Sequence, residues 1–255
     1  MALHIVFDFD CTLTETHLYH TMHSGSFYLE HLKNNISPCW DSRSMRVFDF
    51  IQQSESKWQS NDDDSQFGHK PGLLNDVPYF TNYIFGGPER IEEIRTCLKY
   101  LHSTGAKLHI STKGIVSDVI DMLKNVCFIE FFTYIDGMDD TYETKRLYHV
   151  GKGFCGTQKT FYAKDRELIG LKNPYFFEFK HSFINHLVTS KSNNQVIYLD
   201  DDDEYYKDEY YKGNIGNVLT IDIGTKEQYY KTGNANLSSY NIGVLKNAVE
   251  KFNSF

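Results

Sequence analysis

Two aspartates that follow an apolar stretch near the start of the chain constrain the fold more than any other feature. Residues 5–7 read Ile-Val-Phe, Asp8 comes next, and Asp10 follows after one further Phe. A run of β-branched and aromatic residues predicts a strand, here one buried on both faces. Ligands bind at the carboxyl ends of strands in open α/β sheets, so both carboxylates are expected at such an edge. Because this strand begins near residue 3, we expect no secretory signal peptide.

Apolar segments then alternate with segments of helical periodicity along most of the remaining chain. Strands are predicted at residues 107–110, 128–135, 196–199 and 217–223. Helices are predicted at residues 88–104, 115–123, 181–190 and 242–252. This alternation is typical of an α/β fold with parallel strands and right-handed crossovers. We therefore predict a Rossmann-like, mainly parallel sheet flanked by helices, in which the carboxyl ends of the strands share one edge.

Composition argues against several classes of protein. The 255 residues carry a net charge of −8, whereas a general nucleic-acid binder would present a basic face. No run approaches the ~20 apolar residues of a membrane span. The five cysteines form no C-x-x-C pair, so neither a zinc knuckle nor a disulfide framework is indicated. A reducing compartment fits this pattern, and we predict a cytoplasmic protein.

The pattern Asp-x-Asp-x-Thr that begins at Asp8 resembles the first motif of the haloacid dehalogenase-like (HAD) phosphohydrolases. The resemblance implies that Asp8 is the nucleophile that attacks phosphorus and that Asp10 is the general acid and base. It also implies a hydroxyl group, at the end of the second strand, that binds a phosphoryl oxygen. Thr112 is the predicted residue, and Ser111 is the alternative.

Paired acids at the end of a later strand resemble the fourth motif of the same family. Asp200 and Asp201 follow the strand predicted at 196–199. In this family a lysine near the start of the preceding helix is the third motif, and Lys180 is the predicted residue. The other lysines nearby are Lys164, Lys172 and Lys191.

Several carboxylates at one edge repel each other, and a divalent cation removes this repulsion. All-oxygen ligands favour Mg²⁺. The resemblance implies that Mg²⁺ is held by the carboxylate of Asp8, the backbone carbonyl of Asp10, and Asp201. Asp200 would then orient a neighbouring group or exchange roles with Asp201.

Residues 15–87 separate the first motif from the second and show no strong strand pattern. We predict a mostly helical insert, because apolar residues recur at helical spacing in two places. HAD enzymes often carry a cap at this position, and the resemblance therefore implies a cap over the site. The predicted catalytic core comprises residues 1–14 and 88–255.

Three further patterns carry weaker signals. No cysteine or carboxylate completes a metal site with His17, His20, His23 and His31, so substrate contact or packing is the preferred interpretation. Residues 151–156 read G-x-G-x-x-G within a long polar stretch that we expect to be irregular. A turn or hairpin loop is preferred there over a dinucleotide site, because the residues that follow are a poor helix start. The sequence contains no G-x-x-x-x-G-K-[ST] loop, which argues against a P-loop ATPase.

Together these features predict a Mg²⁺-dependent phosphatase that hydrolyses phosphate monoesters through an aspartyl-phosphate intermediate. Its predicted substrate is a small phosphometabolite or a phosphoprotein, including one with phosphotyrosine. The alternatives are a HAD-type phosphotransferase and a non-catalytic HAD-like binding module. A composition rich in Asn, Tyr and Lys also suits an exported bacterial effector that acts inside a host cell, which is the alternative location.

Overall fold

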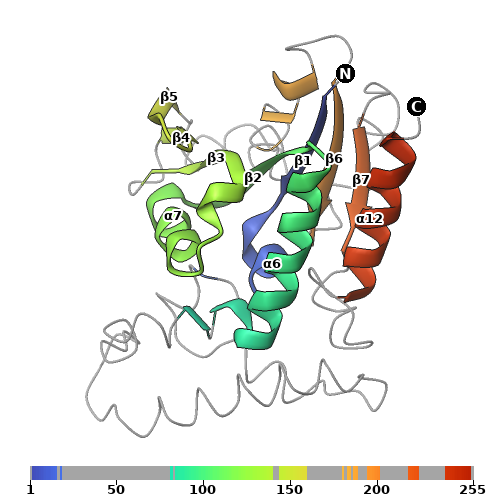
Figure 1. The fold of residues 1–255 in the computed structure, drawn as a ribbon. Coiled ribbons are helices and arrows are strands. Elements are labelled where there is room, and N and C mark those ends of the chain that lie inside the picture. The colour runs from blue at the N-terminus through green and yellow to red at the C-terminus, as the bar shows by residue number, and fades with distance from the viewer. Residues whose placement is uncertain are drawn as a thin grey trace, which may run out of the picture.

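The computed structural model describes a sheet, the helices on one of its faces, and the turns at one of its edges (Figure 1). The described residues are 2–15, 18, 81–82, 84–139, 144–159, 180, 183–184, 186–188, 194–201, 218–223 and 239–253. Most of the predicted insert lies outside them, and its helical character and its boundaries stay predictions. Seven of the histidines and lysines named above also lie outside them: His17, His20, His23, His31, Lys164, Lys172 and Lys191.

The strands and helices follow the predicted alternation. The strands are β1 (Leu3–Phe7), β2 (Lys107–Ile115), β3 (Phe132–Met138), β4 (Thr144–His149), β5 (Gly153–Lys159), β6 (Gln195–Asp200) and β7 (Val218–Asp222). The helices are α6 (Pro88–Ser103), α7 (Val116–Asn125) and α12 (Ser239–Asn253), with short helical turns η1 (Phe9–Leu13) and η2 (Ile129–Phe131). None of the helices in the described part of the chain is long and apolar enough to cross a membrane.

The seven strands form one sheet in the order β5-β4-β3-β2-β1-β6-β7. β1 lies between β2 and β6, is parallel to both, and is the middle one of the five parallel strands β3, β2, β1, β6 and β7. β3 extends the parallel part beyond β2, and β7 extends it beyond β6. The predicted α/β class with a mainly parallel sheet is therefore confirmed, and the first motif leaves the sheet at its centre.

Two strand predictions need correction. The polar stretch expected to be irregular contains the antiparallel hairpin of β4 and β5, which continues the sheet beyond β3. The glycines of the G-x-G-x-x-G pattern lie in its turn and in β5, where Gly151 and Gly153 have φ angles of 86° and 85°. The strand predicted to begin at residue 128 begins at Phe132, because buried Phe128 instead packs edge-on against Phe85.

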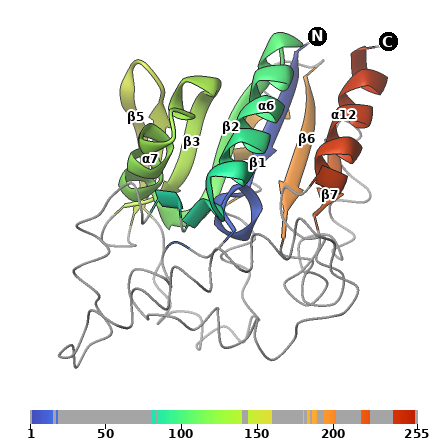
Figure 2. The ribbon, with the colours of Figure 1, turned by 60° about the horizontal axis from the view of Figure 1, so that its bottom comes forward.

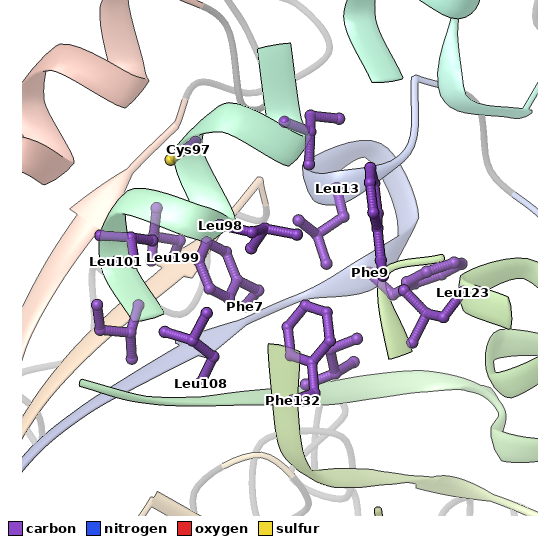
Figure 3. Packing of buried hydrophobic residues seen from close by; sticks show 14 of the residues in the cluster. Phe7, Phe9, Leu13, Cys97, Leu98, Leu101, Leu108, Leu123, Phe132 and Leu199 are labelled. Carbon is purple, nitrogen blue, oxygen red and sulfur yellow. The ribbon is translucent and has the colours of Figure 1, made fainter. Parts of the chain in front are cut away.

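One face of the sheet is apolar and lies against α6, α7 and α12 (Figure 2). Alternate strand residues form this face: Ile5, Phe7, Leu108, Ile110, Ile135, Ile197 and Leu199. Figure 3 shows Phe7, Leu108 and Leu199 meeting Leu98 and Leu101 of α6. Each side chain of this size contributes about 1.5–3 kcal/mol when it is fully buried, so this face accounts for much of the stability.

The opposite face mixes apolar and polar side chains. Its apolar cluster joins Val6, Val196 and Tyr198 to Phe183, Ile184 and Leu187, which belong to the segment that covers this face. Beside that cluster lie two buried histidines, and His4 Nδ1 is 2.9 Å from His109 Nε2. The ring of His109 also stacks on Tyr134. This face therefore combines packing with hydrogen-bonding and ionisable groups.

A buried arginine joins the two points between which the predicted insert lies. Arg90, at the start of α6, donates from Nη1 to the carbonyl oxygens of Leu13 and Phe85, each at 2.8 Å. Its Nε lies 3.1 Å from the Glu15 carboxylate, and both side chains are almost fully buried. The backbone N–H of Glu15 donates to the carbonyl of Ile84 at 2.8 Å. These contacts hold residues 13–15 and 84–85 next to each other.

Candidate active site

The turn that follows β1 places the first two acidic side chains. Asp8 leaves the strand in an extended conformation, and Cys11 then adopts a left-handed conformation with φ 57°. Thr14 Oγ1 fixes this turn, because it accepts the backbone N–H of Cys11 and donates to the carbonyl of Phe9, both at 3.1 Å. Asp8 and Asp10 are consequently held at the carboxyl end of the central strand, and both are buried.

Asp8 is bound to the predicted lysine. Lys180 Nζ donates to Asp8 Oδ1 at 2.8 Å and to Asp200 Oδ2 at 2.6 Å. All three residues are at most 5% exposed, so the two ion pairs are shielded from water. Register explains why the carboxylates meet: Phe7 pairs with Leu199, and the residues that follow them on β1 and β6 are the two aspartates.

Burial of Asp8, Lys180 and Asp200 changes the protonation of the predicted nucleophile, Asp8. Loss of hydration raises the pKa of Asp8 from 3.8 to about 7, although the Lys180 ammonium acts in the opposite direction. The carboxylates of Asp200 and Asp10 raise it further. A carboxylate in such a place needs more positive charge than one lysine supplies before its ionised form is favoured near neutral pH.

The carboxylates of Asp8, Asp200 and Asp201 form a group that fits a metal ion. Each offers one oxygen, and these oxygens all lie within 4.8 Å of one another. A set of hard carboxylate oxygens is the donor chemistry that Mg²⁺ prefers. The group contains Asp200 as well as the predicted Asp201, so the fourth motif contributes both of its acids to this corner of the sheet.

The second predicted acid, Asp10, is oriented by the backbone. Its Oδ1 accepts the N–H of Leu18 at 2.7 Å. Its Oδ2 is on the side of Gly114, where it lies 3.6 Å from the point that a Cβ of that residue would occupy. Thr112 Oγ1 lies 3.3 Å from the same point. Asp10 and Thr112 therefore face the same space beside the end of β2.

The two hydroxyls proposed for the second motif have different partners. Ser111 Oγ donates to Asp136 Oδ2 of the adjacent strand β3 at 3.0 Å, and both residues are fully buried. Thr112 Oγ1 accepts the backbone N–H of Gly114 at 3.0 Å. Ser111 is thus engaged with a carboxylate of the sheet, whereas Thr112 lies in the last part of β2, where the register with β3 is irregular, and faces the same space as Asp10.

β3 packs tightly against the last part of β2. A Cβ on Gly137 would lie 2.8 Å from the carbonyl oxygen of Gly114 and 2.7 Å from Val116 Cγ2. Only a glycine lets the two backbones approach this closely. The part of β2 that carries Thr112 is consequently held in place by the end of the neighbouring strand.

The structure thus brings together five predicted residues: Asp8, Asp10, Thr112, Lys180 and Asp201. Whether the backbone carbonyl of Asp10 acts as a ligand stays a prediction. Sequence reasoning missed two polar residues that contact other motif residues: Tyr198, which contacts Asp200, and Asp136, which contacts Ser111. Tyr198 reads as one more member of an apolar strand, yet its hydroxyl donates to Asp200 Oδ2. Asp136 directly follows the strand predicted at 128–135, just as the other acids follow their strands. This position could have identified it as a candidate site residue.

Several solved structures are similar to this chain over almost their whole lengths. One is the HAD domain of effector protein Lem4 from Legionella pneumophila, with 11% identity and a TM-score of 0.43, covering 97% of this chain and 94% of that one. Another is a haloacid dehalogenase-like family protein from Streptococcus pneumoniae, with 18% identity and a TM-score of 0.40, covering 96% and 97%. A phosphoserine phosphohydrolase-like protein from Francisella tularensis has 13% identity and a TM-score of 0.37, covering 96% and 99%. At these TM-scores the likenesses carry no argument about activity.

The comparison of sequences is more decisive. No curated protein matches the chain. The sequence model of the haloacid dehalogenase-like hydrolases matches residues 5–149, which is more than half of the chain and includes the first two motifs. The parallel sheet, with Asp8 at the end of its central strand, agrees with that match. The chain belongs to the haloacid dehalogenase-like hydrolase family.

Proposed function

We propose that the protein is a Mg²⁺-dependent phosphatase that hydrolyses phosphate monoesters through an aspartyl-phosphate intermediate. The observation that carries this proposal is the position of Lys180, whose ammonium group bridges Asp8 and Asp200. A phosphate dianion approaches a carboxylate nucleophile only where positive charge offsets the repulsion. The lysine supplies part of that charge within hydrogen-bonding distance of the nucleophile.

In the first step an oxygen of the Asp8 carboxylate attacks phosphorus in line with the leaving oxygen. The bond between phosphorus and the leaving oxygen breaks, and an acyl-phosphate bond to Asp8 forms. Lys180 then stabilises the negative charge on the transferring group. Thr112, or Ser111 in its place, donates a hydrogen bond to a phosphoryl oxygen and orients it.

We assign both proton transfers to Asp10 through Oδ2, because Oδ1 accepts the Leu18 N–H. Protonated Asp10 gives its proton to the leaving oxygen in the first step. In the second step the Asp10 carboxylate takes a proton from water, and this water attacks the phosphorus of the aspartyl phosphate. Asp8 leaves as a carboxylate and inorganic phosphate is released, so both residues return to their starting states.

Asp8, Asp200 and Asp201 would hold Mg²⁺, together with the backbone carbonyl of Asp10. Bound Mg²⁺ supplies positive charge that offsets the repulsion between these carboxylates and the phosphate dianion. The raised pKa of Asp8 supports this assignment, because the metal-free site favours the ionised nucleophile less than water does. Lys180 alone does not reverse that effect.

The test is phosphate release from p-nitrophenyl phosphate, with Mg²⁺ and with EDTA, by the wild type and by Asp8→Asn. We expect release that needs Mg²⁺ and is abolished in the variant. Rapid acid quenching should trap a phosphorylated wild-type protein, in which Asp8 carries the group. Full activity of Asp8→Asn would overturn the nucleophile assignment, and an inactive wild type would favour a binding module.

The substrate class requires a panel of sugar phosphates, nucleotides, phosphoserine peptides and phosphotyrosine peptides. A preference for sugar phosphates or nucleotides would identify a phosphometabolite enzyme, and a preference for peptides would identify a phosphoprotein phosphatase. Each reaction is repeated with an added alcohol. Transfer of phosphate to that alcohol in preference to water would identify a phosphotransferase.

A further inference from the structure

We propose that Tyr198 is a positioning residue of this site. Its hydroxyl holds the Asp200 carboxylate so that one oxygen of that group serves Lys180 and the other is directed toward the metal. This inference rests on the proposed function, since it concerns how the same site is kept in its working geometry. It adds a residue that neither the sequence motifs nor the family match assigns.

The position of Tyr198 on β6 makes the contact with Asp200 direct. Residues two apart on a strand point to the same face, so both side chains project toward the segment that carries Lys180. The hydroxyl of Tyr198 donates to Asp200 Oδ2. Both residues have no exposed surface, so water does not compete for this contact.

Asp200 Oδ2 has two donors, the Tyr198 hydroxyl and the Lys180 ammonium. Two donors on one oxygen fix the rotation of the carboxylate about its bond to Cβ. In this proposal the other oxygen, Oδ1, is the one that would face a metal ion held with Asp8 and Asp201, whose carboxylates lie in the same acidic group. Without the hydroxyl, the carboxylate would lose one of the two donors that hold Oδ2 in place.

The choice of tyrosine is informative because packing alone does not need its hydroxyl. The ring lies in the apolar cluster with Val6, Val196 and Phe183. A phenylalanine would fill that space equally well, and a buried hydroxyl without a partner would be destabilising. A phenol adds a donor without adding charge, so it orders Asp200 while leaving the balance between the lysine and the carboxylates unchanged.

The same cluster also connects Tyr198 to the segment that bears the lysine. Phe183 and Ile184 follow Lys180 by three and four residues, and they pack in the cluster that contains the tyrosine ring. Tyr198 therefore acts on both partners of the ion pair: its ring supports the segment of Lys180, and its hydroxyl orients Asp200. Removing only the oxygen separates these two roles.

The experiment compares Tyr198→Phe with a matched control, Tyr134→Phe. Tyr134 lies on β3 and packs against the same apolar cluster as Tyr198, on the same face of the sheet. The first readout is Mg²⁺ affinity, measured by calorimetry on the protein without substrate. Loss of a partner that orients a metal ligand typically weakens metal binding or activity by about 10–100-fold. We expect at least a tenfold loss of Mg²⁺ affinity in Tyr198→Phe, and less than a twofold change in Tyr134→Phe.

The second readout is kinetic and uses a double-mutant cycle. Tyr198→Phe should lower kcat about tenfold with KM nearly unchanged, because Lys180 still reaches the phosphate. In an Asp200→Ala background, which has no side-chain acceptor for the hydroxyl, the same substitution should have no further effect, since the hydroxyl acts through that carboxylate. Additive effects in the cycle, or wild-type Mg²⁺ affinity in Tyr198→Phe, would overturn the proposal.

The two readouts separate this proposal from the proposed function. If the wild type binds Mg²⁺ but releases no phosphate from any ester, the phosphatase assignment fails. The calorimetry then decides the role of Tyr198 without reference to catalysis. Circular dichroism of each variant confirms that it is folded, and Tyr198→Phe keeps the ring that the core requires.

Discussion

The two faces of the sheet are built from alternate residues of the same strands, yet one face packs the core and the other carries the candidate site. The face against α6, α7 and α12 is apolar, with Phe7 and Leu199 at its centre (Figure 3). The other face carries Asp8 and Asp200 one residue further along the same two strands. Neighbouring residues of one strand therefore have different roles: one packs in the core, and the next belongs to the candidate site.

This difference shows where stability and reactivity are placed. The apolar face contains little that titrates, whereas the other face buries two histidines, a lysine and several aspartates. Buried ionisable groups are costly unless they are paired, and they persist in functional sites. We therefore expect substitutions on the first face to act on folding and those on the second to act on activity and on its pH dependence.

The largest effect on stability is expected from Phe7→Ala on the apolar face. Phe7 is fully buried among α6 and the neighbouring strands, so its loss leaves a cavity and should lower the free energy of unfolding by about 3–5 kcal/mol. Urea unfolding measures this. Leu219→Ala is the control, because Leu219 is 41% exposed and its truncation should cost less than about 0.5 kcal/mol. Leu219 lies on the same face, next to Ile197, so equal losses in the two variants would show that burial does not set the contribution of this face to stability.

Lys180→Met should have the largest effect on activity from the opposite face. It removes the ammonium that bridges Asp8 and Asp200 while keeping most of the volume of the chain. By analogy with the loss of a group that stabilises transition-state charge, kcat should fall about 10²–10³-fold. Steady-state kinetics at saturating Mg²⁺ measure it. Lys152→Met, at an exposed position of the hairpin turn, should retain wild-type kinetics.

A smaller effect concerns the two buried histidines on the polar face. Burial, with Lys107 nearby, lowers the pKa of His4 from 6.5 to about 4, and burial also lowers the pKa of His109 well below 6.5. The unfolded chain therefore binds protons before the folded protein does. The stabilising contribution of this pair is complete above about pH 6.5 and decreases as the pH falls toward 4.

The free energy of unfolding should therefore rise with pH over that range, with a slope of at most about 1 kcal/mol per pH unit from His4. The measurement is the free energy of unfolding at several pH values, for the wild type and for the double variant His4→Phe with His109→Phe. Asp8 titrates in an overlapping range with the opposite sign, so the difference between the two curves isolates the histidines. Parallel curves would show that the pair does not respond to pH.

The smallest expected change is a gain in stability. Asp8 has a raised pKa, so its ionised form destabilises the metal-free folded protein, increasingly as the pH rises from 3.8 through about 7. Asp8→Asn should therefore raise the melting temperature at pH 8 in EDTA while activity is lost. Saturating Mg²⁺ should reduce this gain, because the wild type then gains a cation that the variant binds weakly. A lower melting temperature of the variant in EDTA would contradict the balance of charges described for the site.

Much of the fold could be predicted because apolar periodicity reports burial. β1, α6 and β6 are marked by runs of apolar residues that the sheet and its helices bury. The hairpin of β4 and β5 could not be found in this way. β4 reads Thr-Lys-Arg-Leu-Tyr-His, and a strand this polar at one side of the sheet carries little periodic signal.

The candidate site could be predicted only in outline. The resemblance identified which acids matter, and the alternation of strands and helices predicted that they share an edge. It could not distinguish Asp200 from Asp201, because that choice depends on which face of β6 looks toward Lys180. The role of Tyr198 could not be predicted for a related reason. In a buried strand a tyrosine fits the apolar pattern as well as a phenylalanine does, and only the structure shows where the tyrosine hydroxyl lies.

Arg90 has a consequence for how a chain of this kind can change. Since one guanidinium group binds a carbonyl near each end of the predicted insert, those of Leu13 and Phe85, the distance between these two anchor points is set by the core. Lengthening a connection between anchored ends costs little free energy. New segments can thus be exchanged between the anchors to suit new substrates, while the aspartates next to them keep their places.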